Sequence, residues 1–260
     1  MRTIKKVASH IFIDGFGGMT QGLFATLIIG TMIQQIGLLI GGSTGNVIYL
    51  LGKAAAALTS AGIGVGVAVK YGESPLVTVS AAVAAMVGGY AGKITGGTFF
   101  VDGNAVLAGP GEPLGAFIAA FAGITCGHLV SGKTKVDIIV TPVITIGAGS
   151  VVGLLVGPPI SQMMTGLGSI INWATEQRPF IMGIVVSVVM GMVLTLPISS
   201  AALGIILNLS GLAAGAATIG CCCNMVGFAV ASYRENKFGG LVAQAVSYTH
   251  LRAHETRRHL

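Results

Sequence analysis

The sequence is short of charge. Asp, Glu, Lys and Arg together make up only 8% of its 260 residues, whereas 53% of the residues are hydrophobic and the mean hydropathy is +0.87. A soluble globular domain carries roughly 25% charged residues. The composition therefore excludes an ordinary soluble domain and predicts a multi-pass membrane protein, in which 41 glycines let helices approach each other closely.

Cysteine is scarce as well, and its spacing argues against a metal site. Cys126 stands alone, while Cys221, Cys222 and Cys223 are consecutive. Neighbouring residues of a helix point about 100° apart, so three consecutive cysteines cannot present a tetrahedral set of thiolates, and no Cys-x-x-Cys pair occurs. We predict no metal and no cofactor, and interpret these cysteines as small residues packed in membrane helices.

Signatures of catalysis and of nucleic-acid binding are also missing. The sequence shows no His-Glu-x-x-His motif, no pattern typical of a Ser-His-Asp triad, and no Cys or His in a context that suggests a phosphorylated intermediate. Its net charge of +6 comes from short loops rather than from one basic patch. We therefore predict no catalytic residue and no nucleic-acid partner, and do not expect the chain to act as an enzyme on its own.

What the sequence has in abundance is long apolar runs. Six of them come close to the ~20 residues that cross a bilayer, at 22–41, 47–69, 75–92, 114–131, 138–157 and 179–197. The run 198–232 is too long for one crossing and too short for two, so we expect a re-entrant element or short span over 198–210, then a span over 211–232. The predicted fold is an all-α transmembrane bundle with broken or re-entrant helices and about seven or eight membrane segments.

The remaining segments differ in composition. Residues 1–20 mix charged and apolar side chains and predict an interfacial amphipathic lead-in to a transmembrane domain over 21–245. Pro158-Pro159 opens a segment, 158–178, whose apolar side chains recur at helical spacing, so we expect an amphipathic helix on the membrane surface. Residues 246–260 are abruptly charged and rich in His, and resemble a translated sequencing adapter. They are interpreted as a non-native tail on a C-terminally truncated domain.

The distribution of basic residues predicts the orientation. With a cytoplasmic N-terminus and alternating spans, six basic residues fall on the inner side and two in the outer loops, which is the positive-inside bias. The inner ones are Arg2, Lys5, Lys6, Lys70, Lys133 and Lys135, and the outer ones are Lys93 and Arg178. Lys53, in the first turns of the second span, is expected to snorkel to the outer face.

The candidate binding site is the stretch 99–117, which holds two of the eight carboxylates and the sequence Gly109-Pro110-Gly111 between apolar segments. A backbone interrupted in this way cannot cross hydrocarbon as a helix, so protein must cover it or it must line an aqueous cavity. Glu112 is predicted to bind substrate or, alternatively, to stabilise the next helix N-terminus. Asp102 and Asn104 are predicted to bind substrate or to form a turn.

Two further positions complete the predicted substrate-binding set. His128 lies near the end of the fourth span, where an ionisable side chain is a functional candidate, although a helix-terminal histidine equally suits a dipole partner. Asn208 is an amide in an apolar run, as is Asn224. A buried amide needs a partner, which is either another helix or a polyhydroxylated ligand.

Four segments, 22–31, 102–117, 196–202 and 227–236, together resemble the membrane IIC component of bacterial phosphotransferase-system sugar transporters, in the branch of the perfringolysin-regulator-like proteins. The resemblance implies a multi-pass protein of the bacterial inner or plasma membrane, forming a homodimer. It also implies that the chain binds and moves a sugar while IIA and IIB partners supply the phosphoryl group. Sugar binding in such proteins involves an acidic residue, a histidine and amides, which supports Glu112, Asp102, Asn104, His128 and Asn208 here.

Three functions remain open from the sequence. The chain is a IIC-type permease, a membrane-embedded regulator or sensor that shares the fold, or an ion-coupled carrier of a small solute with Glu112 as the proton site. All three need the same pocket, so the residues alone do not separate them.

Overall fold

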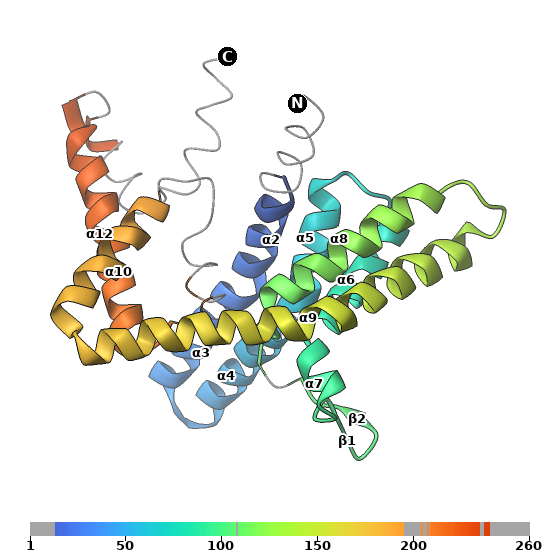
Figure 1. Cartoon of the computed structure of the whole chain (residues 1–260), viewed down its shortest axis with the longest axis horizontal. Coiled ribbons are helices and arrows are strands. Elements are labelled where there is room, and N and C mark those ends of the chain that lie inside the picture. Colours follow the sequence, from blue (N-terminus) through green and yellow to red (C-terminus); the bar gives the residue numbers. More distant parts are fainter. Residues whose placement is uncertain are drawn as a thin grey trace. The chain divides into compact units, whose positions relative to one another are not determined.

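The computed structural model describes residues 14–107, 109–194, 204, 207, 209–234 and 237–239. Helices dominate this part of the chain, and a two-stranded antiparallel hairpin accompanies them (Figure 1). The predicted all-α membrane fold is confirmed. In chain order the elements are α2 (Phe16–Leu23), η2 (Phe24–Ile28), α3 (Ile29–Ile40), α4 (Gly42–Ala57), α5 (Thr59–Lys70), α6 (Pro75–Gly89), α7 (Ala91–Thr95), β1 (Phe100–Val101), β2 (Asn104–Ala105), α8 (Pro113–Val130), α9 (Asp137–Gln177), α10 (Pro179–Val193) and α12 (Gly211–Ala231).

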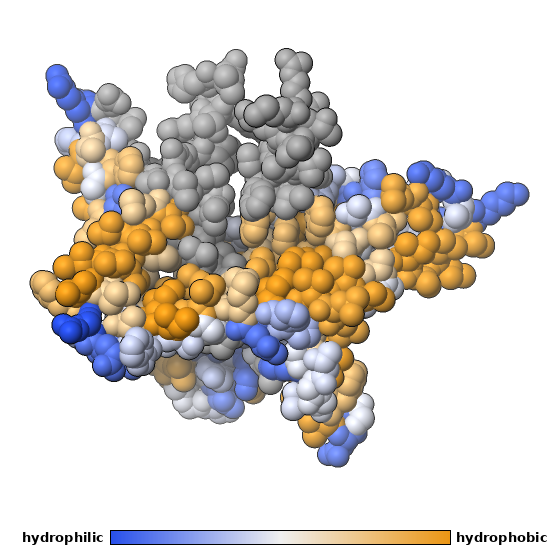
Figure 2. Space-filling model, viewed as in Figure 1, coloured by the Kyte–Doolittle hydropathy of each residue, from blue (hydrophilic) through white to orange (hydrophobic). Residues whose placement is uncertain are grey.

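Several of these helices are long and apolar enough to cross a membrane. Among the described residues they are Phe16–Ile40, α8, α9 and α12, and the bent pair α4–α5 adds a fifth, while α6 and α10 are shorter apolar helices. Apolar side chains cover the outward faces of α8 and α9, and hydrophilic ones gather at the turn between them (Figure 2). A surface of this kind suits lipid.

The span predicted over 47–69 is not one straight helix. α4 ends at Ala57, α5 begins at Thr59, and their axes differ by 53°. The Thr59 hydroxyl donates to the carbonyl of Ala56 at 2.6 Å, so a side chain takes a carbonyl near the end of α4. Local side-chain bonds of this type compete with the helical ladder and bend helices. The apolar run 47–69 therefore forms a bent pair of helices, in keeping with the broken helices predicted for the fold.

The break predicted at Pro158-Pro159 is absent. α9 is one helix of 41 residues with Pro142, Pro158 and Pro159 in its interior. Each proline removes a backbone hydrogen bond, yet the helical path continues through all three. Six apolar side chains were predicted to face a membrane surface, and four of them, Met163, Leu167, Ile170 and Trp173, are exposed. The other two, Met164 and Ile171, are half-buried. Their surface location stays a prediction.

The chain divides into two compact units, residues 1–164 and 165–260, and the dividing line falls inside α9. The single transmembrane domain predicted over 21–245 stays a prediction beside this division. The re-entrant element predicted over 198–210 lies almost wholly outside the described residues, as do the first thirteen residues and the tail 246–260. α2 begins at Phe16, inside the predicted lead-in.

Glycines set the packing of the first unit. A Cβ on Gly22 would collide with the backbone of Gly62, and one on Gly52 would lie 2.5 Å from Gly30 O. Similar contacts join Gly18 to Gly66 and Gly37 to Gly45. The stretch from α2 to α3 therefore runs against α5 and α4 at backbone contact, and the chain reverses at Gly41 and Gly42, both of which have positive φ. Close approach of this kind is how helices associate in lipid.

The second unit repeats the principle on a smaller scale. α10 packs against α12, where a Cβ on Gly220 would collide with the backbone of Ser187. Val186, Met190 and Ala217 form its buried apolar cluster. The Asn172 side-chain carbonyl accepts the N–H of Ser210 at 3.1 Å, which fixes the residue that precedes α12.

We predict that Gly52→Ala destabilises the protein by about 1–3 kcal/mol, because the methyl group has no room beside Gly30 O and Gln34 N. Gly147→Ala is the matched control, since a Cβ there has no neighbour within 4 Å. It should be neutral or stabilising, because alanine favours helix. Thermal unfolding of both variants in detergent checks this, and equal melting temperatures would refute the packing argument.

Candidate functional site

The N-terminus of α8 is capped by Glu112. One carboxylate oxygen accepts the N–H of Leu114 at 3.1 Å, and the other accepts the N–H of Gly115. Pro113 takes the first helical position, where a missing N–H leaves nothing unsatisfied. Glu112 thus has the structural role weighed for it from the sequence. Each carboxylate oxygen offers more than one lone pair, so the cap leaves acceptor capacity for a ligand.

The segment 109–112, which precedes α8, is fastened to the ends of α5 and α6. The bonds run from the Tyr90 hydroxyl to Gly109 O, from Ser60 Oγ to Pro110 O at 3.0 Å, and from Glu112 N to Gly89 O at 2.7 Å. Tyr90 and Ser60 are 1% and 0% exposed. Backbone groups that no helix satisfies are therefore paired with buried partners, as interrupted chain in an apolar setting requires.

Glycine makes this docking sterically feasible. A Cβ on either Gly89 or Gly111 would collide with Ser60 Oγ. Gly111 also has φ of +76°, a conformation that other residues rarely adopt. The serine hydroxyl therefore occupies a niche that exists only because both neighbours lack side chains.

The break between α4 and α5 meets the same segment. The Tyr90 hydroxyl lies 3.2 Å from the carbonyl of Ala57, the last residue of α4, as well as next to Gly109 O. Two interruptions of helical structure, distant in sequence, are thus brought together. We call residues 57–60, 88–90 and 109–112 the junction. Discontinuous helices are where membrane transporters place substrate and ion sites.

The electrostatics of the junction centre on Glu112. Burial raises the pKa of its carboxyl above the usual range, while the N–H groups of Gly115 and Leu114 favour the charged form. Glu112 directly precedes α8 rather than lying inside it. A carboxyl held in this balance is able to act either as an anion that accepts hydrogen bonds or as a proton carrier.

Asp102 and Asn104 lie in the exposed hairpin of β1 and β2. Val101 pairs with Asn104 across a two-residue turn, in which Asp102 has φ of +51° and Gly103 has φ of +75°. The Asn104 amide donates to Asp102 O at 3.3 Å. Asp-Gly with two positive φ values is the usual turn for such hairpins. The structure therefore shows the turn role that was weighed for both residues.

His128 lies at the opposite end of α8 from Glu112, about 24 Å away along the helix at 1.5 Å per residue. Its Nδ1 is 3.0 Å from a carboxylate oxygen of Glu73 in the α5–α6 turn, and the Ser74 and Ser131 hydroxyls are 3.0 Å apart beside it. In the same turn, burial raises the pKa of Tyr71 to about 12, with a smaller contribution from the negative charge of Asp14, so its phenol stays neutral. The structure does not bring His128 to the junction.

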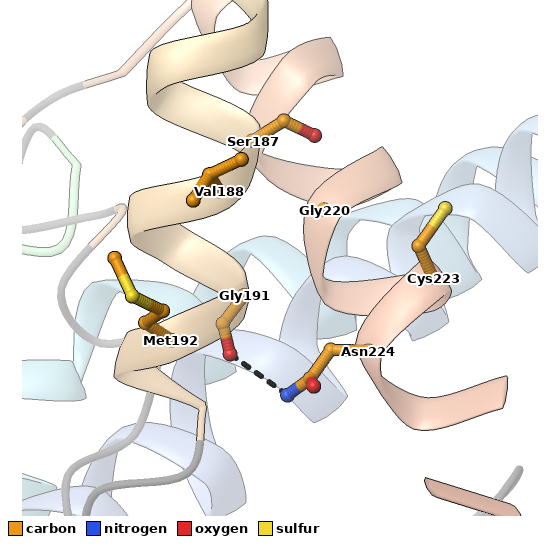
Figure 3. A pocket seen from close by; sticks show the side chains of 7 residues that line it. All are labelled: Ser187, Val188, Gly191, Met192, Gly220, Cys223 and Asn224. Carbon is orange, nitrogen blue, oxygen red and sulfur yellow. Dashed lines mark hydrogen bonds between the residues drawn. The ribbon is translucent and has the colours of Figure 1, made fainter. Parts of the chain in front are cut away.

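Asn208 lies outside the described residues. The buried-amide partner expected for Asn224 is another helix: its side-chain amide donates a hydrogen bond to Gly191 O of α10 at 2.7 Å (Figure 3). This bond crosses from α12 to α10 beside a pocket lined by Ser187, Val188, Gly191, Met192, Gly220, Cys223 and Asn224. The pocket belongs to the second unit, and it was not predicted from the sequence.

Within the described ranges, no group of three or more His, Cys, Asp or Glu side chains is arranged to hold a metal ion. Cys222 and Cys223 are exposed and Cys126 is half-buried, all as free thiols.

Sequence reasoning missed Ser60 and Tyr90, which carry the junction. Both lay within predicted spans, 47–69 and 75–92, and both bond to carbonyls far along the chain. The available signal was their polarity: a serine and a tyrosine within apolar spans need partners.

The arrangement as a whole defines a class: a multi-pass helical membrane protein with an interrupted, polar junction between helices. A comparison with protein families matches residues 13–255 to the family described as "Phosphotransferase system, EIIC", and the chain belongs to this family. No curated protein and no solved structure matches the chain.

The family assignment confirms the predicted IIC component. The chain is a membrane-embedded permease component of a phosphotransferase system, in which other components carry out phosphoryl transfer. The match extends to residue 255, into the segment interpreted as a non-native tail. That interpretation and the perfringolysin-regulator-like branch stay predictions.

We predict that Gly89→Ala loosens the junction and lowers the melting temperature, because its methyl group would displace Ser60 Oγ from Pro110 O. A loss of about 1–3 kcal/mol is expected. Gly92→Ala, where a Cβ has no neighbour within 4 Å, is the control and should leave stability nearly unchanged. If both variants melt together with the wild type, the niche around Ser60 is not tightly packed.

Proposed function

We propose that this chain translocates a sugar and that the junction forms part of the sugar site. The observation that supports this most directly is the meeting of the α4–α5 break with the segment 109–112 around one carboxylate, Glu112. In a protein of the EIIC family, an interrupted polar element inside a helical bundle is the natural place for a polar substrate.

Helix lengths support a position within the membrane. α5 has 12 residues and α6 has 15, so they extend about 18 Å and about 22 Å, less than the ~30 Å hydrocarbon core. The turn that joins them carries Lys70 and Glu73, charges suited to the membrane surface. From that surface, the far ends of both helices at Thr59 and Gly89 fall short of the opposite side. The junction would then lie at a depth where a sugar needs protein partners.

The chemistry of the junction suits a polyhydroxylated ligand. A carboxylate and backbone carbonyls accept hydrogen bonds from sugar hydroxyls, and the N-terminus of α8 favours the negative charge of Glu112. We place the substrate contact on Glu112. Asp102 and Asn104 would act from the hairpin at the entrance, and His128 lies at the far end of α8, away from this contact. Asn208, outside the described residues, stays a predicted substrate-binding residue.

The partners and setting follow from the same proposal. IIA and IIB components would phosphorylate the transported sugar, the chain would form a homodimer, and it would reside in a bacterial plasma membrane with its N-terminus in the cytoplasm. The inner side would then present the exposed Lys70, Lys133 and Lys135 to those partners.

One observation favours a second function, an ion-coupled carrier. Glu112 combines burial with a raised pKa, as a proton-carrying carboxyl does. Uptake that persists without phosphoenolpyruvate but stops when the proton gradient collapses would support this carrier and contradict the phosphotransferase permease.

Substitution of Glu112 should separate capping from sugar binding. Against a sugar panel in a thermal-shift assay, one sugar should stabilise the wild type, by about 2.7 kcal/mol at one hundred times its Kd. Glu112→Ala should lose the helix cap, which lowers the free energy of unfolding by about 0.5–2 kcal/mol, and should also lose the stabilisation by sugar. Glu112→Asp should keep the cap, because aspartate is a good N-cap residue, but bind the sugar more weakly.

His128→Gln is the control for that experiment. It removes the contact between the exposed His128 ring and the nearly buried Glu73 carboxylate, at the end of α8 away from the junction, and should leave the sugar response intact. A sugar response that survives in Glu112→Ala but disappears in His128→Gln would move the site to the other end of α8. No response to any sugar would favour the membrane-embedded regulator.

Cysteine labelling should establish the orientation. In a background with the four native cysteines replaced by alanine, Thr98→Cys and Lys133→Cys introduce exposed thiols in the connections that precede and follow α8. On intact cells, a membrane-impermeant thiol reagent should label position 98 and not position 133. The reverse pattern would overturn the proposed topology.

A further inference from the structure

The Tyr90 hydroxyl lies between two carbonyl acceptors that belong to different interruptions of the helices. It donates to Gly109 O, and Ala57 O lies 3.2 Å away at the end of α4. A phenol has a single O–H proton, so it can make only one full-strength donation at a time. Tyr90 is 1% exposed, and water is not at hand to provide an alternative acceptor.

We propose that the Tyr90 hydroxyl is a two-position latch on the segment 109–111. When the segment is docked, the hydroxyl donates to Gly109 O. When the segment lifts, the hydroxyl donates to Ala57 O instead. A buried hydroxyl left without an acceptor is strongly disfavoured. The second carbonyl removes this penalty from the released state, so the two states lie close in free energy.

The local backbone confines the motion to a few residues. Glu112 stays in place, because its N–H donates to Gly89 O and its carboxylate caps α8. Gly109 and Gly111 have φ of +81° and +76°, and glycine crosses between backbone regions more easily than other residues. Ser60 supplies a second fastening through Pro110 O, which would break when the segment lifts.

The latch deepens the proposed function and rests on it for its purpose, which is to control access to the sugar site beside Glu112. Its existence is tested without any sugar. A latch that is demonstrated while no sugar binds would leave the device standing and refute the sugar site.

Hydrogen exchange of the full chain, followed by mass spectrometry, tests the latch. Tyr90→Phe removes only the hydroxyl and keeps the ring, which packs on Phe99 at 5.3 Å between centroids. Gly109 O is the closer of the two acceptors, so loss of the hydroxyl weakens the docked state more than the released state. The amides of Gly109 and Gly111 should exchange about threefold faster, the effect of a fraction of one net hydrogen bond, while Glu112, α5 and α6 keep their wild-type rates. Tyr49→Phe is the control, because the Tyr49 hydroxyl makes no hydrogen bond within the described residues. It should change nothing.

Unchanged exchange at 109–111 in folded Tyr90→Phe would overturn the proposal, as would a rise spread evenly over α5, α6 and α8. If Tyr90→Phe does not fold, 3,5-difluorotyrosine at position 90 replaces it. That residue keeps the hydroxyl and is a stronger donor, so exchange at 109–111 should slow. Equal or faster exchange with the fluorinated residue would also refute the latch.

Discussion

The structure of the first unit depends on one constraint: backbone polar groups outside helices must find partners in an environment with little water. Two of the places where the chain is not helical are Leu58, between α4 and α5, and the segment 109–112, which ends the connection from α7 to α8. The hydroxyls of Ser60 and Tyr90 provide the partners for both places. Two discontinuities that would each be unfavourable alone are thereby brought together, and a polar site arises where they meet.

Glycine is the second requirement, because the polar contacts form only when backbones touch. The same residue type serves the apolar packing of α2 and α3 on α5 and α4 and the polar niche around Ser60. In lipid, where burial of apolar surface drives no association between helices, close approach supplies the van der Waals contact that holds them. The glycine content that marks the composition is therefore used at specific positions.

Much of the fold could be predicted from apolar runs and their Gly and Pro boundaries. The spans predicted at 75–92 and 114–131 match α6 and α8 within three residues, because Pro75 and Pro113 begin those helices. The bend at Leu58 could not be predicted, since Thr59 and Ser60 are small residues in an otherwise apolar run and the carbonyl partner of Ser60 lies 50 residues away at Pro110. The persistence of α9 through Pro158 was missed because proline was taken as a helix breaker.

Only part of the candidate site could be predicted from the sequence, because some of its contacts join residues far apart in the chain. Glu112 was predicted because a carboxylate beside Gly-Pro-Gly stands out in an apolar sequence, and its role in substrate binding stays a prediction. The carbonyl partners of Ser60 and Tyr90 are visible only in three dimensions.

The π turn η2 determines which way Gly30 faces. In a regular α-helix the eight residues from Gly22 to Gly30 would rotate about 80° beyond two full turns. The π turn at Phe24–Ile28 holds more residues per turn and cancels that excess, so Gly22 faces Gly62 of α5 while Gly30 faces Gly52 of α4. The π turn therefore keeps Gly30 on the side of the helix that faces α4. If the turn were replaced by regular α-helix, Gly30 would rotate away from α4.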